Sequence, residues 1–253
     1  MEARASCFPS VKKTLSILRK IRKRKEIGRL KLYALVPYAY EYVRLATQVG
    51  GISGLSKKLA REIVVSGNLK AIVAGLKAVT MMDPESLMKA YLTYEISRIK
   101  FSAGKHANLD SVLLHEIITD MAVALGLDWL FKSYIDFILD LGMTPGFETR
   151  NFVYLVNRFM QWNIDFKDII IAAPFNRVGF QMNPSRGDCE KALASLRERS
   201  VIAMSILAAG YLKPSQAIGY IRDLSNLRGV VVGVSKEHHA RETFRFFKEE
   251  IKW

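Results

Sequence analysis

Short apolar runs alternate with amphipathic stretches along most of the chain. The runs are nearly continuous in hydrophobicity, which is the pattern of parallel strands that are covered on both faces. Their starts are separated by about 25 to 40 residues, which is the length of one strand-plus-helix unit. We predict strands at seven runs: 32–36, 69–76, 111–114, 143–147, 169–173, 201–206 and 230–234.

Three dipeptides place a proline close to the start of a predicted helix. They are Asp83-Pro84, Asn183-Pro184 and Lys213-Pro214. Proline is favoured at the first helical position, because the N–H that it lacks has no partner there, and Asp and Asn are favoured caps. These dipeptides therefore predict three helix starts between the strands.

This alternation over 253 residues predicts an α/β fold, a (β/α)8 TIM-type barrel that forms one domain of residues 1–253. Residues 1–31 would be a basic N-terminal helical segment and residues 32–253 the barrel units. A doubly wound open sheet is the competing architecture. Its G-x-G-x-x-G turn does not follow an early strand in this sequence.

The first barrel strand is predicted to be missing or short, because the chain enters at a helix that begins near Ser10. Either residues 4–8 form a short first strand or the barrel is open there. An open parallel edge exposes unpaired backbone groups. We therefore expect such an edge to be covered, with a homo-oligomer as one way of covering it.

The chain is strongly basic, with 38 Lys and Arg against 24 Asp and Glu. Residues 12–31 hold ten basic residues and one acid. Such charge suits nucleic acid, an anionic lipid surface or a phosphorylated ligand. A solvated helix face is the favoured alternative, because Leu15, Leu18 and Ile21 repeat at helical spacing. Nucleic acid is not favoured, because no aromatic residues are interleaved with these cations.

Several classes of protein are disfavoured by the composition. No apolar run reaches the roughly 18 residues that span a bilayer, so we expect no transmembrane segment. Residues 1–8 contain no signal-peptide core. Cys7 and Cys189 fit no metal or redox spacing, so we expect a cytoplasmic protein without a metal site.

Candidate catalytic residues follow the predicted strands, because barrel enzymes carry their chemistry at the carboxyl ends of the strands. His115 is a candidate acid or base, with a packing role as the alternative. Lys77 is a candidate acid, base or Schiff-base donor, and its alternative is a lysine whose head reaches solvent. Tyr38 and Tyr40 are candidate proton donors, and a packing role is the alternative for both.

A phosphate site is predicted where the chain leaves the last strand through Gly-Val-Ser and enters a basic helix. Ser235, Lys236 and Arg241 would surround a helix N-terminus, which binds anions. Ser205 and Gly210 come from the preceding unit, and barrels often place a phosphate between their last two units. Ordinary capping by Ser235 is the alternative.

The second half of the chain resembles the aldo-keto reductase family. Its segments DSVLLHEIITD, APFNRVGF, VIAMSILAAGYL and VVVGVSKEHHARETF are similar, in this order and spacing, to four segments of that family. The resemblance covers about residues 70–250. A divergent group of prokaryotic barrels related to these reductases resembles the chain more closely.

The resemblance implies an oxidoreductase that reduces a small carbonyl substrate with NADP(H). His115 and Lys77 match the family histidine and lysine, and Tyr38 or Tyr40 would take the place of its tyrosine. Among the cofactor-binding positions, Ser235 matches the family serine that holds the adenosine phosphate. The others that the resemblance assigns to the cofactor are Ser205, Gly210, Lys236, Arg241 and Asn176.

The family pattern is incomplete in this chain. The segment YALVPYAYEY has no acid where the family carries its aspartate. Glu148 and Thr149 fall near the Ser-Asn pair that grips the nicotinamide amide, and Ile206 replaces a proline. The phosphate end of the cofactor site is therefore better preserved than the reactive end.

Three functions follow as hypotheses. The first is the NADP(H)-linked reductase. The second is a non-redox barrel lyase or isomerase that acts on a phosphorylated metabolite, with Lys77 as base and His115, Glu148 or Asp120 as its partner. The third is a protein without catalysis whose basic N-terminal helix binds nucleic acid or a membrane surface.

Overall fold

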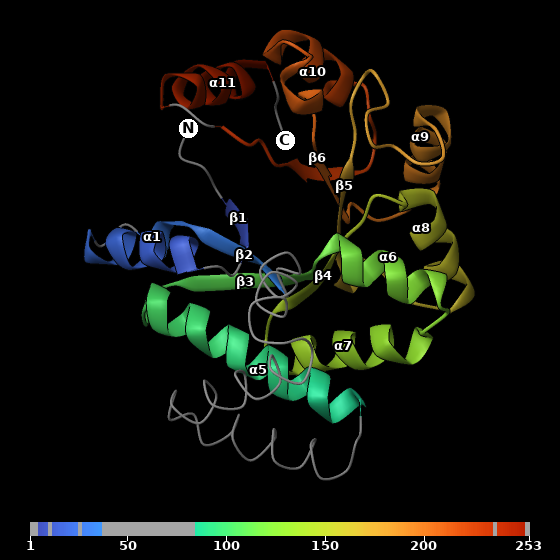
Figure 1. The fold of residues 1–253 in the computed structure, drawn as a ribbon. Coiled ribbons are helices and arrows are strands. Elements are labelled where there is room, and N and C mark those ends of the chain that lie inside the picture. Colours follow the sequence, from blue (N-terminus) through green and yellow to red (C-terminus); the bar gives the residue numbers. More distant parts are fainter. Residues whose placement is uncertain (1–4, 10–11, 25–26, 37–83, 235–236, 251–253) are drawn as a thin grey trace, which may run out of the picture. The chain divides into compact units, whose positions relative to one another are not determined.

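The structure, a computed structural model, describes residues 5–9, 12–24, 27–36, 84–234 and 237–250. The chain divides into two compact units. Of the described residues, those at 5–9, 12–24, 27–36, 84–115 and 129–143 form the N-terminal unit, and those at 116–128, 144–234 and 237–250 form the C-terminal unit. Both units are of the α/β type, with parallel strands and intervening helices (Figure 1).

Among its described residues, the N-terminal unit has three strands that pair in parallel and in chain order, β1-β2-β3. Its elements are β1 (Ala5–Pro9), α1 (Lys12–Lys23), η1 (Ile27–Arg29), β2 (Lys31–Val36), α5 (Pro84–Ala103), β3 (Asn108–Leu114) and α7 (Asp128–Asp140). The short first strand predicted at residues 4–8 is confirmed as β1. The strand predicted at 69–76 lies outside the described residues, and β2 pairs directly with β3.

The core of the N-terminal unit forms between its strands and helices. β2 and β3 are buried along most of their length, as expected for parallel strands covered on both faces. α5 begins at Pro84, as predicted, and buries residues such as Leu92 and Ile99. From α7, the hydroxyl of Tyr134 donates a hydrogen bond of 2.6 Å to the carbonyl oxygen of Val112 in β3.

The described part of the C-terminal unit has four parallel strands, again in chain order. α6 contacts β4 and α8, α8 contacts α9, and α10 contacts α11 (Figure 1). The elements are α6 (Glu116–Ala124), β4 (Thr144–Glu148), α8 (Phe152–Gln161), η2 (Phe166–Asp168), β5 (Ile170–Pro174), α9 (Arg186–Ser195), β6 (Val201–Met204), η3 (Ala208–Gly210), α10 (Pro214–Arg222), β7 (Leu227–Val230) and α11 (Glu237–Glu250).

Aromatic side chains fill the core of the C-terminal unit. Phe147 of β4 meets Phe159 of α8 edge to face, with ring centroids 5.0 Å apart. Phe152 and Phe175 form a second edge-to-face pair at 5.2 Å. All residues of β5 and β6 are buried or nearly so. Because β4 enters this packed core, the side chain at its carboxyl end is held in a fixed place.

Two predicted boundaries in the C-terminal unit are wrong. The last strand is Leu227–Val230 rather than 230–234, because β7 pairs with β6 from Val201 onward and β6 ends at Met204. Residues 231–234 therefore form no regular element between β7 and the following helix. α9 begins at Arg186, not next to Asn183-Pro184, because the Ser185 hydroxyl caps it by accepting from the Asp188 N–H at 3.1 Å.

Within the residues that the structure describes, no helix combines the length and the hydrophobicity that are needed to cross a membrane.

Candidate active site

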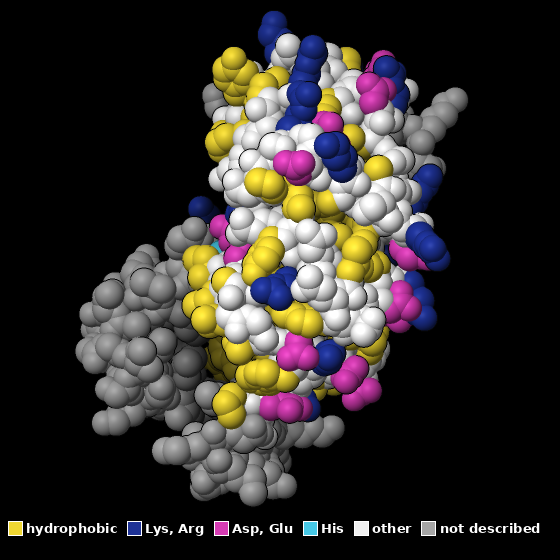
Figure 2. All heavy atoms as spheres, turned by 90° about the vertical axis from the view of Figure 1, so that its right-hand side faces the viewer, with side chains coloured by type: hydrophobic (Ala, Val, Ile, Leu, Met, Phe, Trp, Pro, Cys, Tyr) yellow, Lys and Arg dark blue, Asp and Glu magenta, His cyan; other side chains and the backbone are white. Residues whose placement is uncertain are grey.

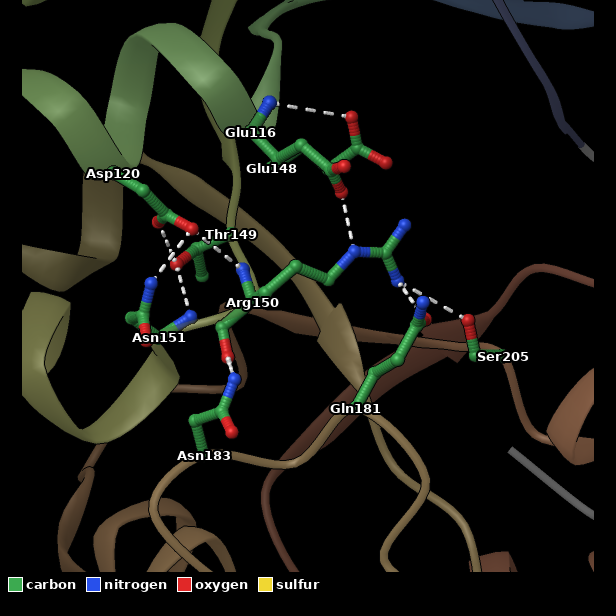
Figure 3. Close-up of polar contacts among 9 residues, drawn as sticks. All are labelled: Glu116, Asp120, Glu148, Thr149, Arg150, Asn151, Gln181, Asn183 and Ser205. Atoms are coloured by element: carbon green, nitrogen blue, oxygen red, sulfur yellow. Dashed lines mark hydrogen bonds and ion pairs between the residues drawn. The ribbon is translucent and has the colours of Figure 1, made fainter.

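Polar side chains gather at the carboxyl ends of the strands in the C-terminal unit. Because these strands are parallel, their carboxyl ends meet at one edge of the sheet, which is where α/β proteins bind ligands. Figure 3 shows the cluster, which comprises Glu116, Asp120, Glu148, Thr149, Arg150, Asn151, Gln181, Asn183 and Ser205. We call this set the strand-end cluster.

Arg150 connects the members of the strand-end cluster. Its Nε donates to the carboxylate of Glu116, the first residue of α6, in an ion pair. Its Nη1 donates to Oε1 of Gln181 at 2.7 Å and to Oγ of Ser205 at 3.3 Å. The guanidinium thus reaches from α6 to the end of β6, as Figure 3 shows. The side chain remains 26% exposed, so its charge is open to a ligand.

Glu148 is the last residue of β4 and is only 9% exposed. Its Oε2 accepts a long hydrogen bond of 3.4 Å from the backbone N–H of Glu116. Burial raises the pKa of the Glu148 carboxyl to about 7, with help from the negative charge of Glu116 and against the opposing charge of Arg150. At neutral pH this carboxyl can therefore both give and take a proton.

Asp120 holds the turn that carries Arg150. Its carboxylate accepts from the hydroxyl of Thr149, from the backbone N–H of Arg150 at 3.2 Å and from Nδ2 of Asn151 at 2.9 Å. Burial raises the pKa of Asp120, although these three hydrogen bonds lower it. Asp120 is therefore a positioning residue for the turn 149–151.

Nη1 of Arg150 donates hydrogen bonds to two residues that both have a left-handed backbone conformation. Gln181 has φ 60° and Ser205 has φ 53°. This conformation costs a residue other than glycine about 1 kcal/mol or more. Such conformations concentrate at ligand sites, where the surrounding structure enforces them. Here they direct two acceptors toward the same guanidinium.

The loop that carries Gln181 is held by a buried amide. Asn176, which is fully buried, donates from Nδ2 to the carbonyl of Phe180 and accepts from its N–H, both at 2.8 Å. Asn183 closes the loop from its other end by donating to the carbonyl of Arg150 at 3.2 Å. Gln181 is thus fixed between two hydrogen-bonded anchors.

The structure places some of the predicted residues in or beside the cluster. Ser205, a predicted cofactor-binding residue, lies in it. Asn176 supports it through the 176–180 loop. Gly210 has φ 91° in the turn after β6. His115 follows β3 directly, as predicted, and is buried in the N-terminal unit.

The remaining predicted residues lie outside the described residues or are not members of the strand-end cluster. Tyr38, Tyr40, Lys77, Ser235 and Lys236 lie outside the described residues. Arg241 forms an exposed ion pair of 2.7 Å with Glu237 on α11. β7 ends at Val230, and the phosphate site predicted around Ser235, Lys236 and Arg241 stays a prediction.

Sequence reasoning did not find the interactions around Arg150. Glu148, Thr149 and Arg150 were recognisable as residues that follow a strand, but Gln181 carried no signal at all. The side-chain partners of the Arg150 guanidinium are 31 to 55 residues away in the chain, so only the fold brings them together. Within the described part of the chain, no group of three or more His, Cys, Asp and Glu residues is arranged to hold a metal ion.

Comparison with protein-family models, with curated proteins and with solved structures finds no match to this chain. The similarity to aldo-keto reductases therefore rests on the four short segments alone and stays a prediction.

Proposed function

We propose that the chain is an acid–base enzyme that moves a proton on a small anionic substrate, a non-redox isomerase or lyase. Glu148 would be the proton-transferring group and Arg150 the anion-binding group. The observation that carries this proposal is a buried carboxyl at the end of β4, beside an arginine that remains partly exposed. This pairing suits a substrate with a carboxylate or phosphate group.

The chemistry requires no change in oxidation state. Glu148 in its ionised form takes a proton from substrate carbon or oxygen, and the charge left behind is stabilised by the guanidinium of Arg150. Glu148 exchanges this proton with solvent and then gives a proton to another atom of the substrate, or to a leaving group. A carboxyl with a pKa of about 7 is suited to both steps at neutral pH.

Proton exchange with solvent tests this proposal without knowledge of the product. The protein is incubated in D₂O with a panel of phosphorylated and carboxylated metabolites, and loss of substrate proton signals is followed by ¹H NMR. We expect exchange on at least one substrate, and a decrease of about 10²-fold or more in Glu148→Gln. Glu198→Gln, an exposed glutamate of the same unit, is the matched control. Absence of exchange across the panel, or full exchange in Glu148→Gln, would contradict the proposal.

The NADP(H) reductase is the second candidate function, and one observation favours it. Ser205, predicted to contact the cofactor, follows β6 directly and accepts a hydrogen bond of 3.3 Å from Arg150. Titration with NADPH and NADH, followed by tryptophan fluorescence, separates the two candidates. Saturable binding that prefers NADPH at moderate salt would support the reductase, and equal weak binding that salt removes would exclude it.

We further propose that the strands belong to a TIM-type barrel and that the protein acts in the cytoplasm. Parallel strands in chain order, each followed by at least one helix, support the barrel. The composition supports the location, because the two cysteines, Cys7 and Cys189, form no disulfide with each other.

A further inference from the structure

A basic surface lies on the N-terminal unit, where the ends of α1 and α5 come together. Residues 12–24 contain seven Lys and Arg and no acid, and residues 96–107 contain three more, again with no acid. The two segments are far apart in the sequence, but α1 packs against α5 (Figure 1). We call the exposed side chains of these two segments the basic surface.

Direct contacts join the two segments. Nη1 of Arg22 donates to the carbonyl oxygen of Phe101 at 3.1 Å. The Arg22 side chain also lies against Gly104, where an added Cβ would come within 2.8 Å of its Cδ. Gly28 of η1 approaches the next turn closely, because a Cβ there would lie 3.2 Å from the carbonyl oxygen of His106. The cations at the end of α1 therefore lie near those that flank Phe101.

Phe101 is the unusual member of the basic surface. Its side chain is 75% exposed, whereas phenylalanine is usually buried. Lys100 and Lys105 stand on either side of it in the sequence, and both are exposed. An aromatic ring in water among cations has little value for folding, and it suits a ligand that combines negative charge with flat apolar faces.

Among the described residues, several cations of the basic surface form no ion pair, whereas Arg98 pairs with Glu95 at 2.7 Å. Arg22 has a structural role, because it binds a carbonyl at the end of α5, where a positive charge is favourable. No carboxylate of the described residues pairs with Lys20, Lys23, Lys100 or Lys105. The face that carries α8 and α9, seen in Figure 2, differs because Lys and Arg side chains there are interspersed with Asp and Glu.

We propose that the basic surface binds single-stranded nucleic acid. Its lysines and arginines would contact phosphates, and Phe101 would stack on a base. An anionic membrane fits less well, because a helix that binds there inserts its apolar face. In α1 that face is occupied, since Leu15 and Leu18 are packed in the core at 4% exposure each. This inference concerns the N-terminal unit and does not depend on the proposed catalysis.

Fluorescence anisotropy with a labelled single strand of roughly 15 nucleotides tests the proposal. Phe101→Ala should weaken binding about fivefold or more without changing the salt dependence, because it removes stacking and no charge. Lys100→Gln combined with Lys105→Gln should instead make the slope of log affinity against log salt shallower by about 1.4. These three residues are exposed, and circular dichroism checks that each variant is folded.

Lys191→Gln combined with Arg199→Gln is the matched control, because it removes two exposed cations from the C-terminal unit. It should leave both affinity and slope close to those of the unaltered protein. The proposal is overturned if Phe101→Ala binds as tightly as the unaltered protein, or if the control weakens binding as much as the Lys100 and Lys105 changes. Phosphatidylserine vesicles that bind where the oligonucleotide does not would also overturn it and would assign the surface to a membrane.

Discussion

Glu116 and Glu148 show how position decides the chemistry of two identical side chains. Glu116 begins a helix and has Arg150 as its ion-pair partner. Glu148 ends a buried strand, has only a long hydrogen bond from a backbone N–H, and lies close to the charge of Glu116. The arginine therefore stabilises one carboxylate, and the other remains available for proton transfer.

The raised pKa of Glu148 predicts a pH-dependent loss of stability. A free glutamate titrates near 4.5 and Glu148 near 7, so the folded state binds more protons between these pH values. Stability then falls as the pH rises through this range, by on the order of 3 kcal/mol. Glu148→Gln lacks this loss. In urea unfolding, Glu148→Gln should have the same free energy of unfolding as the unaltered protein at pH 4.5 and a higher one at pH 8.

Asp120 is present in both the unaltered protein and Glu148→Gln, so its titration affects the stability of both equally. The difference in unfolding free energy between the two proteins therefore reports on Glu148. If the two proteins differ by the same free energy at both pH values, the pKa of Glu148 is not raised by burial.

Asp120 predicts a separate effect on the turn 149–151. Asp120→Ala removes the acceptor of three donors and should cost about 2 to 4 kcal/mol of unfolding free energy, since buried donors are left unpaired. Asp168→Ala, an exposed aspartate of the same unit, should change stability by less than about 0.5 kcal/mol. Equal losses in the two variants would show that Asp120 does not hold the turn.

At the scale of elements, the turn after β6 carries backbone strain that can be measured. Ala208 and Ala209 have φ 46° and 56°, and neither side chain gains anything visible from this conformation. Glycine adopts it without a steric penalty. Ala209→Gly should therefore raise the unfolding free energy by up to about 1 kcal/mol, net of the freedom that glycine adds to the unfolded chain.

Ala192→Gly, within α9, provides the opposite case. There the same replacement should lower stability by about 1 kcal/mol, because alanine is the better helix former. Thermal or urea unfolding of the two variants compares them directly. A loss in both would mean that the turn is not strained at Ala209.

Most strands were predictable because continuous apolar runs mark parallel strands that are buried on both faces. β5 at 170–174 lies one residue from its predicted position, and β1 appears where a short first strand was one of two options. The run at 230–234 was wrongly predicted to be the last strand, because its valines are as apolar as those of a strand. Hydrogen bonding to β6 decides the register, and sequence periodicity carries no information about that partner.

The strand-end cluster was predictable only as a set of positions. Residues after strands could be named, and Ser205 and Glu148 were among them. The left-handed backbone of Gln181 and the contact of Arg22 with Phe101, 79 residues apart, depend on packing between distant segments. For that reason the sequence alone could not predict that Phe101 lies next to the basic helix.

At the scale of the whole molecule, the prediction that the sheet closes into a barrel can be tested at one backbone amide, that of Val230. The N–H of Val231 donates to Ala203 of β6 at 2.8 Å. Because successive residues of a strand point their N–H groups to opposite sides, the N–H of Val230 points away from β6. In a barrel that closes through β1, this N–H has a hydrogen-bond acceptor in β1, whereas at an open edge it donates to water.

Hydrogen exchange followed by NMR at several protein concentrations distinguishes the arrangements. We expect Val230 to exchange as slowly as Val231 at every concentration, because a closed barrel protects both within one chain. Protection of Val230 that appears only at high concentration would instead mean that a second copy covers the edge. Fast exchange of Val230 beside a protected Val231 would show an open sheet, and the TIM-type barrel would then be wrong.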